Sequence, residues 1–120
     1  MTNREKIREA YRDGWREMDP EKLIATLAPG FIFDDPIVPE PITKDTIAHH
    51  MAFWNEKAKD LSVEWNYVLS DEVQEDKDGV LMRWGWWKVT GTNLEGSRVE
   101  KVTDEGVVFE RIAYYTAPPS

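Results

Sequence analysis

The sequence predicts an α+β domain in which three N-terminal helices pack on one face of a highly curved, mostly antiparallel sheet. Three segments with apolar residues at helical spacing occupy most of the first half of the chain, and four long strand-like segments occupy the second half. A single strand between the second and third helices completes the order α-α-β-α-β-β-β-β. Helices segregated from a run of antiparallel strands are typical of α+β domains.

Composition places limits on the class of protein. A chain of 120 residues with 41% apolar residues is expected to form one domain, residues 1–120. The net charge of −8 argues against nucleic acid or an anionic membrane surface as a partner, since both require clustered Lys and Arg. The absence of Cys excludes disulfides, thiolate catalysis and Cys-based metal sites. No secretory signal or membrane-spanning run is visible, so we expect a cytoplasmic protein.

The first predicted helix covers residues 2–18. Thr2 is followed three residues later by Glu5, which is the pattern of a capping box. Tyr11 and Trp15 lie four residues apart within an apolar stripe, so both should face the buried side. They form either the wall of a pocket or part of an ordinary core.

Two further helices are predicted before the long strands. Asp19-Pro20 indicates a stop and a restart, because Asp caps helices and Pro suits the first helical position. The second helix should cover Glu21–Ala28 and end at Pro29-Gly30. Thr43 is expected to cap a third helix over Lys44–Lys59.

The strand predicted between these helices is Phe31–Asp35. Side chains alternate along a strand, so Asp35 shares a face with Phe33, whereas Asp34 points the other way. An acid held in apolar surroundings binds its proton more tightly. The proline-rich segment 36–41 that follows should be a rigid, irregular loop.

Alternating apolar residues predict the long strands of the second half. The first begins at Leu61 and continues to Ser70, and the acidic run Asp71–Gly79 is interpreted as a solvated turn. The other three strands should cover Val80–Thr92, Ser97–Thr103 and Val107–Thr116. The tryptophans of the second long strand, Trp84, Trp86 and Trp87, are interpreted as core and sheet-face packing or as a homodimer interface.

Helices that cover one face of a bent sheet leave a conical cavity, which is a common site for a small ligand. Asp35 is the best catalytic candidate there, and its alternative role is a turn acid before Pro36. His50 lies inside the apolar stripe of the third helix and is either an acid–base residue or a hydrogen-bonded core histidine. His49 should lie at the surface, and the two adjacent histidines are not expected to bind a metal.

Three local patterns, taken in order, resemble the SnoaL-like and nuclear transport factor 2-like superfamily, whose cystatin-like cone also forms ketosteroid isomerases. The first is Tyr11, eight residues before Asp19. The second is an apolar strand that ends in Asp35-Pro36, and the third is a final strand that ends in Ala113-Tyr114-Tyr115. The resemblance covers nearly the whole chain. It implies the fold more specifically than the activity, because this superfamily includes isomerases, cyclases, dehydratases, hydrolases and binding domains.

The resemblance also implies roles for individual residues. Asp35 takes the place of the general base of ketosteroid isomerases, and Tyr11 takes the place of the tyrosine that donates to the developing oxyanion. The third member of that site is a neutral Asp on a later strand. Here that segment contains Arg98-Val99-Glu100, with no Asp. Arg98 or Val99 occupies the position when the downstream turn is aligned, and Glu100 occupies it after a shift of register.

We therefore expect a small cofactor-independent isomerase, cyclase or hydrolase that acts on an apolar carbonyl or cyclic molecule. Asp35, Tyr11 and His50 are the predicted catalytic residues. The predicted substrate contacts are Trp15, Phe33, Trp54 and Glu100. No metal or cofactor is expected, and a homodimer through the sheet is predicted. The alternatives are a non-catalytic ligand-binding or dimeric interaction domain, and a scaffold whose core fills the cone.

Overall fold

The computed structural model describes residues 1–60 and 67–116. Its elements are α1 (Asn3–Arg16), α2 (Pro20–Ile24), β1 (Leu27–Asp34), β2 (Ile42–Thr43), α3 (Ile47–Asp60), β3 (Tyr67–Lys77), β4 (Val80–Val89), β5 (Glu95–Thr103) and β6 (Gly106–Tyr114). The predicted class and the predicted order of elements are confirmed, with one short strand, β2, added.

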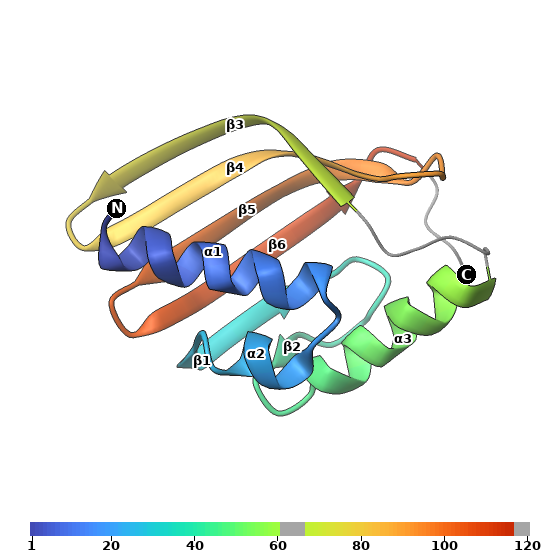
Figure 1. Cartoon of the computed structure of the whole chain (residues 1–120), viewed down its shortest axis with the longest axis horizontal. Coiled ribbons are helices and arrows are strands. Elements are labelled where there is room, and N and C mark those ends of the chain that lie inside the picture. Colours follow the sequence, from blue (N-terminus) through green and yellow to red (C-terminus); the bar gives the residue numbers. More distant parts are fainter. Residues whose placement is uncertain (61–66, 117–120) are drawn as a thin grey trace.

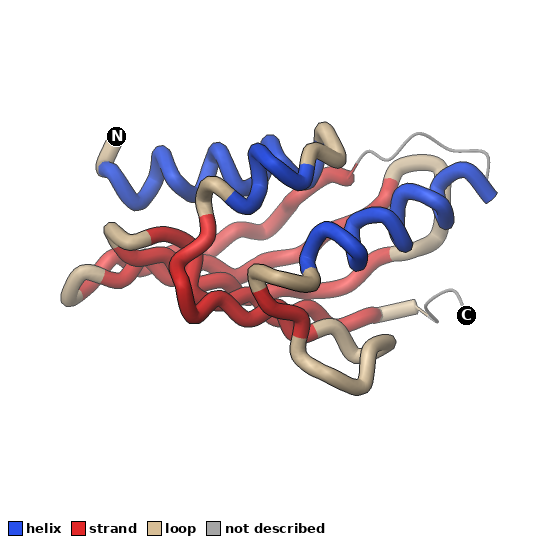
Figure 2. Tube along the Cα trace, turned by 90° about the horizontal axis from the view of Figure 1, so that it is seen from below, coloured by secondary structure: helices blue, strands red, loops and turns tan. Residues whose placement is uncertain are grey.

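The described strands form one open, mixed sheet in the order β2-β1-β6-β5-β4-β3. β1 and β6 are parallel, and the other neighbouring pairs are antiparallel. α1 runs along one face of the sheet with α2 beside it, and α3 lies toward one end of the same side (Figures 1 and 2). The cavity described below lies between these helices and the inner face of the sheet.

Thr2 caps the N-terminus of α1, as the sequence predicts. Thr2 Oγ1 accepts a hydrogen bond from the Glu5 backbone N–H at 3.2 Å and donates to the Glu5 carboxylate at 3.2 Å. This arrangement satisfies a backbone donor that a helix start otherwise leaves without a partner. Tyr11 and Trp15 face inward and are buried, as their spacing predicts.

The second helix is shorter than predicted. Asp19 caps it, with its side chain accepting from the Lys22 backbone N–H, but it ends at Ile24 instead of Ala28. The following residues join β1, because the Val107 N–H donates to the Thr26 carbonyl at 2.8 Å and Leu27 aligns with Val107 of β6. Sheet pairing between distant parts of the chain therefore overrides the local helical pattern, and the register shifts before Ile32.

The proline-rich segment contains β2, which the sequence analysis missed. Ile42 and Thr43 pair with Phe33 and Ile32 of β1. Thr43 is consequently a strand residue and not the helix cap that we predicted. α3 starts at Ile47, three residues later than expected.

The acidic segment after residue 70 is a strand, so its interpretation as a turn is wrong. β3 continues to Lys77, and only Asp78-Gly79 forms the turn, with φ angles of +55° and +81°. A bulge between Ser70 and Val73 interrupts the pairing with β4. The part of the predicted strand from Leu61 to residue 66 lies outside the described residues.

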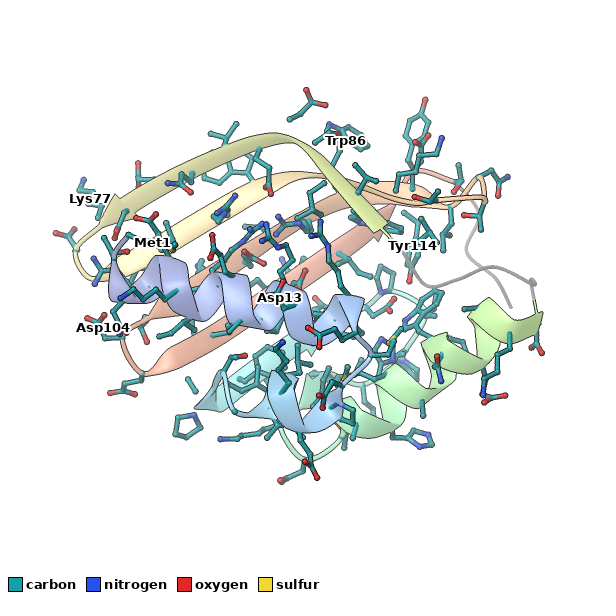
Figure 3. The ribbon with its side chains drawn as sticks, in the orientation of Figure 1. Met1, Asp13, Lys77, Trp86, Asp104 and Tyr114 are labelled. Atoms are coloured by element: carbon teal, nitrogen blue, oxygen red, sulfur yellow. The ribbon has the colours of Figure 1, made fainter. Side chains whose placement is uncertain are left out.

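The hydrophobic core lies between the helices and the inner face of the sheet. Leu23, Phe31 and Ile47 are among its fully buried side chains. Trp84 and Trp86 lie on the outer face and are 40% and 43% exposed, so the core interpretation is wrong for both. Figure 3 shows Trp86 beside β3, away from α1. Within the described ranges, no helix is both long and apolar enough to cross a membrane.

Gly14 lets α1 and α2 approach closely, which gives a test of their packing. A Cβ at this position would lie 2.9 Å from the Leu23 Cα. We expect Gly14→Ala to lower the free energy of unfolding, because overpacking costs about 1–3 kcal/mol and Ala regains only about 1 kcal/mol in helix propensity. Urea unfolding measures the change. Gly30→Ala is the control, since nothing lies within 4 Å of its Cβ position, and an equal effect of both substitutions would contradict this account.

Candidate functional site

A cavity of about 90 Å³ opens between α1, α3 and the inner face of the sheet. Aromatic and aliphatic side chains form most of its wall, including Trp15, Phe33, Trp54, Trp87, Leu94 and Ile112. Polar groups gather on the side of α1 and the central strands, where the lining residues are Arg8, Tyr11, Arg12, Arg98, Glu100 and Glu110. Such a mostly apolar wall with a few convergent polar groups is typical of small-molecule sites.

Tyr11 and Glu110 form a hydrogen-bonded pair in this wall. The Tyr11 hydroxyl donates a short hydrogen bond to the Glu110 carboxyl, and both residues are buried. Burial and the negative charge of Glu100 raise the pKa of Glu110 to about 7, although Arg98, the Tyr11 hydrogen bond and Arg8 act in the opposite direction. Burial and the charge of Glu110 raise the pKa of Tyr11 well above its usual range. Glu110 can therefore hold or release a proton near neutral pH.

The alternation of β5 decides which residue of the later strand faces the cavity. Arg98 and Glu100 point inward and are buried, whereas Val99 points to the outer face. Glu100 is a cross-strand neighbour of Glu110, so two carboxyl groups lie side by side on the inner face. Of the three residues that the resemblance left open, Arg98 and Glu100 therefore face the cavity and Val99 does not.

Buried ion pairs join α1 to the sheet next to this pair of carboxyls. Arg8 donates to Glu100 at 2.9 Å and to Glu72 at 2.8 Å. Arg98 contacts the same two carboxylates at 2.8 Å each, and Arg83 contacts Glu72 at 3.3 Å. Glu72 reaches these guanidinium groups from the bulge of β3, opposite Gly85. Burial and the neighbouring positive charge of Arg8 lower the pKa of Arg83.

Asp35 is fully buried and lies behind Tyr114, one of the residues that line the cavity. Its Oδ1 accepts hydrogen bonds from the Tyr114 hydroxyl at 2.9 Å and the Ile37 backbone N–H at 3.1 Å. Its Oδ2 lies 3.1 Å from His50 Nε2, which also lies 3.1 Å from the indole N–H of Trp54. Since an indole N–H only donates, Nε2 accepts from Trp54 when unprotonated and donates to Asp35 when protonated.

The structure thus separates the predicted site residues into two groups. Tyr11, Trp15, Phe33, Trp54 and Glu100 line the cavity. Asp35 and His50 are not among its lining residues, and they contact it through Tyr114 and Trp54. Figure 3 shows Tyr114 at the end of β6 nearest α3. Asp34 and Asp35, at the end of β1, point in opposite directions as predicted, because Asp35 is buried whereas Asp34 is half-exposed and pairs with Arg111 at 2.8 Å.

Glu110, Arg8 and Tyr114 are the site residues that sequence reasoning missed. The signal for two of them was present in the last strand, because alternation places Glu110 and Tyr114 on one face with Ile112. No local pattern marks Arg8 as a buried residue of α1, because its partners come from strands far along the chain. In the part of the chain that the structure describes, no three His, Cys, Asp or Glu side chains are arranged to hold a metal ion.

The SnoaL-like domain family matches residues 7–117, so the chain belongs to the SnoaL-like family. A search of curated proteins found no match to the sequence.

Solved structures with this fold carry several functional descriptions. A candidate ketosteroid isomerase from Parabacteroides distasonis aligns with a TM-score of 0.70 and 10% identity over 94% of this chain and 88% of its own. A candidate SnoaL-like polyketide cyclase from Shewanella putrefaciens aligns with a TM-score of 0.66 and 16% identity over 95% and 80%. TerC, co-crystallised with polyporic acid, aligns with a TM-score of 0.68 and 14% identity over 94% and 92%. At these identities the likeness shows the cystatin-like fold.

The raised pKa of Glu110 predicts how stability depends on pH. The folded state binds the proton more tightly than the unfolded state, whose carboxyl keeps the ordinary value of 4.5. The associated stability is present below pH 4.5 and is lost as the pH rises through about 7, which amounts to roughly 3 kcal/mol. Glu110→Gln should remove this dependence in urea unfolding between pH 5 and 8. Glu105→Gln, at an exposed turn, is the control, and parallel curves for wild type and Glu110→Gln would contradict the assignment.

Proposed function

We propose that this protein is a small, cofactor-independent acid–base enzyme that moves a proton on an apolar carbonyl or cyclic molecule bound in the cavity. The reaction type is that of an isomerase, a cyclase or a hydrolase. The bound ring would lie against the aromatic wall, and its polar atom would face Tyr11 and Glu110.

The contact between Tyr11 and Glu110 is the observation that carries this proposal. A carboxyl that titrates near pH 7 meets the requirement for a general acid or base at neutral pH. It lies in the wall of an apolar cavity beside a hydroxyl that can donate to a developing oxyanion. The descriptions of the solved relatives as isomerase and cyclase are consistent with proton transfer to or from carbon.

Asp35 remains the base that the resemblance implies, and its surroundings suggest how it would act. Its oxygens bond to Tyr114 and His50, so a proton would pass between Asp35 and a ligand by way of the Tyr114 hydroxyl. Burial and the charge of Asp35 raise the pKa of Tyr114, which keeps that hydroxyl protonated. Glu110 is therefore the direct acid–base group of the proposal, and Asp35 is the group one hydrogen bond further away.

Deuterium exchange at the α-carbon of small cyclic ketones tests the proposal without a known substrate. Cyclohexanone and 1-indanone in D₂O, followed by NMR, should lose their α-protons faster with the protein than with buffer alone. Because Glu110 would remove the proton directly, Glu110→Gln should slow this exchange by on the order of 10²–10⁴. Asp35→Asn should slow it less.

Asp34→Asn is the matched control for Asp35→Asn, because it removes the neighbouring acid on the opposite face. Glu105→Gln serves the same purpose for Glu110. Exchange that survives in Glu110→Gln would overturn its role as the base. Binding of the ketones without any exchange would favour the alternative function, a small-ligand-binding domain.

We also propose that two copies pair through the outer face of the sheet. Trp84 and Trp86 project from it beside a hollow of about 370 Å³, whose floor includes the small side chains Ser97 and Ala113. Projecting side chains next to a hollow on the same surface suit a two-fold contact, in which the tryptophans of each copy enter the hollow of the other. Four strands about 4.8 Å apart and about 30 Å long present roughly 570 Å², which approaches the ~800 Å² per partner of stable interfaces.

Sedimentation over a range of concentrations tests this pairing. Trp86→Ala should convert the dimer to a monomer, because it removes the projecting side chain. Phe53→Ala is the control, since Phe53 is 37% exposed but belongs to α3. A monomeric wild type, or a Trp86→Ala variant that remains dimeric, would contradict the proposed interface.

A further inference from the structure

The indole N–H of Trp15 is a buried hydrogen-bond donor without an acceptor. Trp15 lines the cavity and is only 8% exposed, yet its Nε1 atom meets no acceptor in the part of the chain that the structure describes. A buried donor in this state is unfavourable, and native proteins contain few of them. Its position in the wall of a cavity points to an acceptor that arrives with a ligand.

The other aromatic donors among the described lining residues already have acceptors within the protein. They are the Tyr11 hydroxyl on Glu110, the Trp54 N–H on His50 Nε2 at 3.1 Å, the Trp87 N–H on the Ser97 carbonyl at 3.0 Å, and the Tyr114 hydroxyl on Asp35 at 2.9 Å. These hydrogen bonds hold the four side chains in place as parts of the wall. Of these aromatic donors, the Trp15 N–H is the one left for a ligand.

The Trp15 N–H lies in the same part of the wall as the Tyr11 hydroxyl. Trp15 follows Tyr11 by one turn on the inner side of α1, so the two side chains are neighbours. Burial is the largest cause that raises the pKa of Tyr11, and the nearby Trp15 N–H acts in the opposite direction. The two groups are close, but the N–H does not have hydrogen-bond geometry to the hydroxyl. A ligand oxygen beside Tyr11 would therefore lie within reach of the Trp15 N–H.

We infer that the Trp15 N–H donates a hydrogen bond to the ligand in the cavity, whose polar atom is therefore an acceptor such as the carbonyl oxygen of a cyclic ketone. The inference rests on the proposed function, and it adds the residue that holds the carbonyl group. Before any proton moves, the Tyr11 hydroxyl is committed to Glu110. The Trp15 N–H thus supplies a neutral hydrogen bond to the carbonyl oxygen in the starting complex.

Tyr11 would join this contact as the proton moves. The C–H bond beside the carbonyl breaks, the proton forms an O–H bond with the Glu110 carboxylate, and the electron pair passes to the carbonyl oxygen as an enolate. A protonated Glu110 is a weaker acceptor, so the Tyr11 hydroxyl can turn to the enolate oxygen. Two donors then stabilise a negative charge that is absent from the starting complex, which is the condition for catalysis.

Two probes that differ at one position test the inference. Cyclohexanone and methylenecyclohexane have nearly the same shape, but only the ketone accepts a hydrogen bond. Trp15→Phe keeps an aromatic ring in the wall and removes the N–H. In titrations of the full chain followed by NMR, this substitution should weaken the binding of cyclohexanone about three- to tenfold more than that of methylenecyclohexane, which is the range expected for one neutral hydrogen bond.

Trp87→Phe is the matched control, because Trp87 lines the same cavity and its N–H donates to Ser97 instead. This variant should weaken the binding of both probes to the same degree, within about twofold. The C=O stretching band of bound cyclohexanone, measured by difference infrared spectroscopy, is an independent readout. The band should lie at a higher frequency with Trp15→Phe than with the wild type or Trp87→Phe, because a carbonyl that loses a hydrogen bond is less polarised.

Three results would overturn the inference: no binding of cyclohexanone by the wild type, equal weakening of both probes by Trp15→Phe, or the same C=O band in the wild type and Trp15→Phe. Equal weakening would mean that Trp15 acts only by packing on Phe33 and His50, whose ring centroids lie 5.5 and 6.4 Å from its own.

These outcomes are separate from failure of the proposed enzyme function. Equal rates of deuterium exchange in the wild type and Trp15→Phe, with loss of exchange in Glu110→Gln, would support the enzyme and overturn the inference. Binding of cyclohexanone that depends on the Trp15 N–H, without any exchange, would support the inference and overturn the enzyme, because the protein would then be a binding domain for cyclic ketones.

Discussion

The ion pairs of Arg8 fix the geometry on which the cavity depends. Arg8 bonds to Glu100 and Glu72 from the middle of α1, and these bonds set the position of the helix over β5 and β3. Tyr11 lies three residues further along the same face, so its contact with Glu110 follows from that position. Loss of either partner would leave a buried charge uncompensated, a defect that costs about 3–5 kcal/mol. Stability and the candidate site therefore depend on the same bonds.

Two neighbouring carboxyl groups acquire different properties from their partners. Glu100 accepts a hydrogen bond from Arg8 and forms an ion pair with Arg98, whereas Glu110 accepts a hydrogen bond from a neutral hydroxyl. The two residues are cross-strand neighbours, so the charge of the first makes ionisation of the second less favourable. Position on the sheet thus assigns a structural role to one acid and a titrating role to the other.

Much of the fold could be predicted from periodicity and end signals, because these are local properties. The N-cap at Thr2, the inward direction of Tyr11 and the opposite directions of Asp34 and Asp35 are all confirmed. Glu110 was missed because its burial depends on α1 lying over β6, which no local pattern contains. The acidic segment of β3 was misinterpreted for a related reason: Glu72 is stabilised inside the protein by arginines distant in sequence.

The place of β6 in the sheet has a consequence for biosynthesis. β6 is the last of the described strands, yet it lies between β1 and β5 and joins the two halves of the sheet. During translation, the edge of β1 that pairs with Val107–Arg111 must stay unpaired until β6 has been synthesised. An apolar strand edge exposed for that time invites pairing with other nascent chains. The sheet can therefore be completed only after β6 has emerged, and the edge of residues 27–34 is the part of the described chain that would gain most from chaperone protection until then.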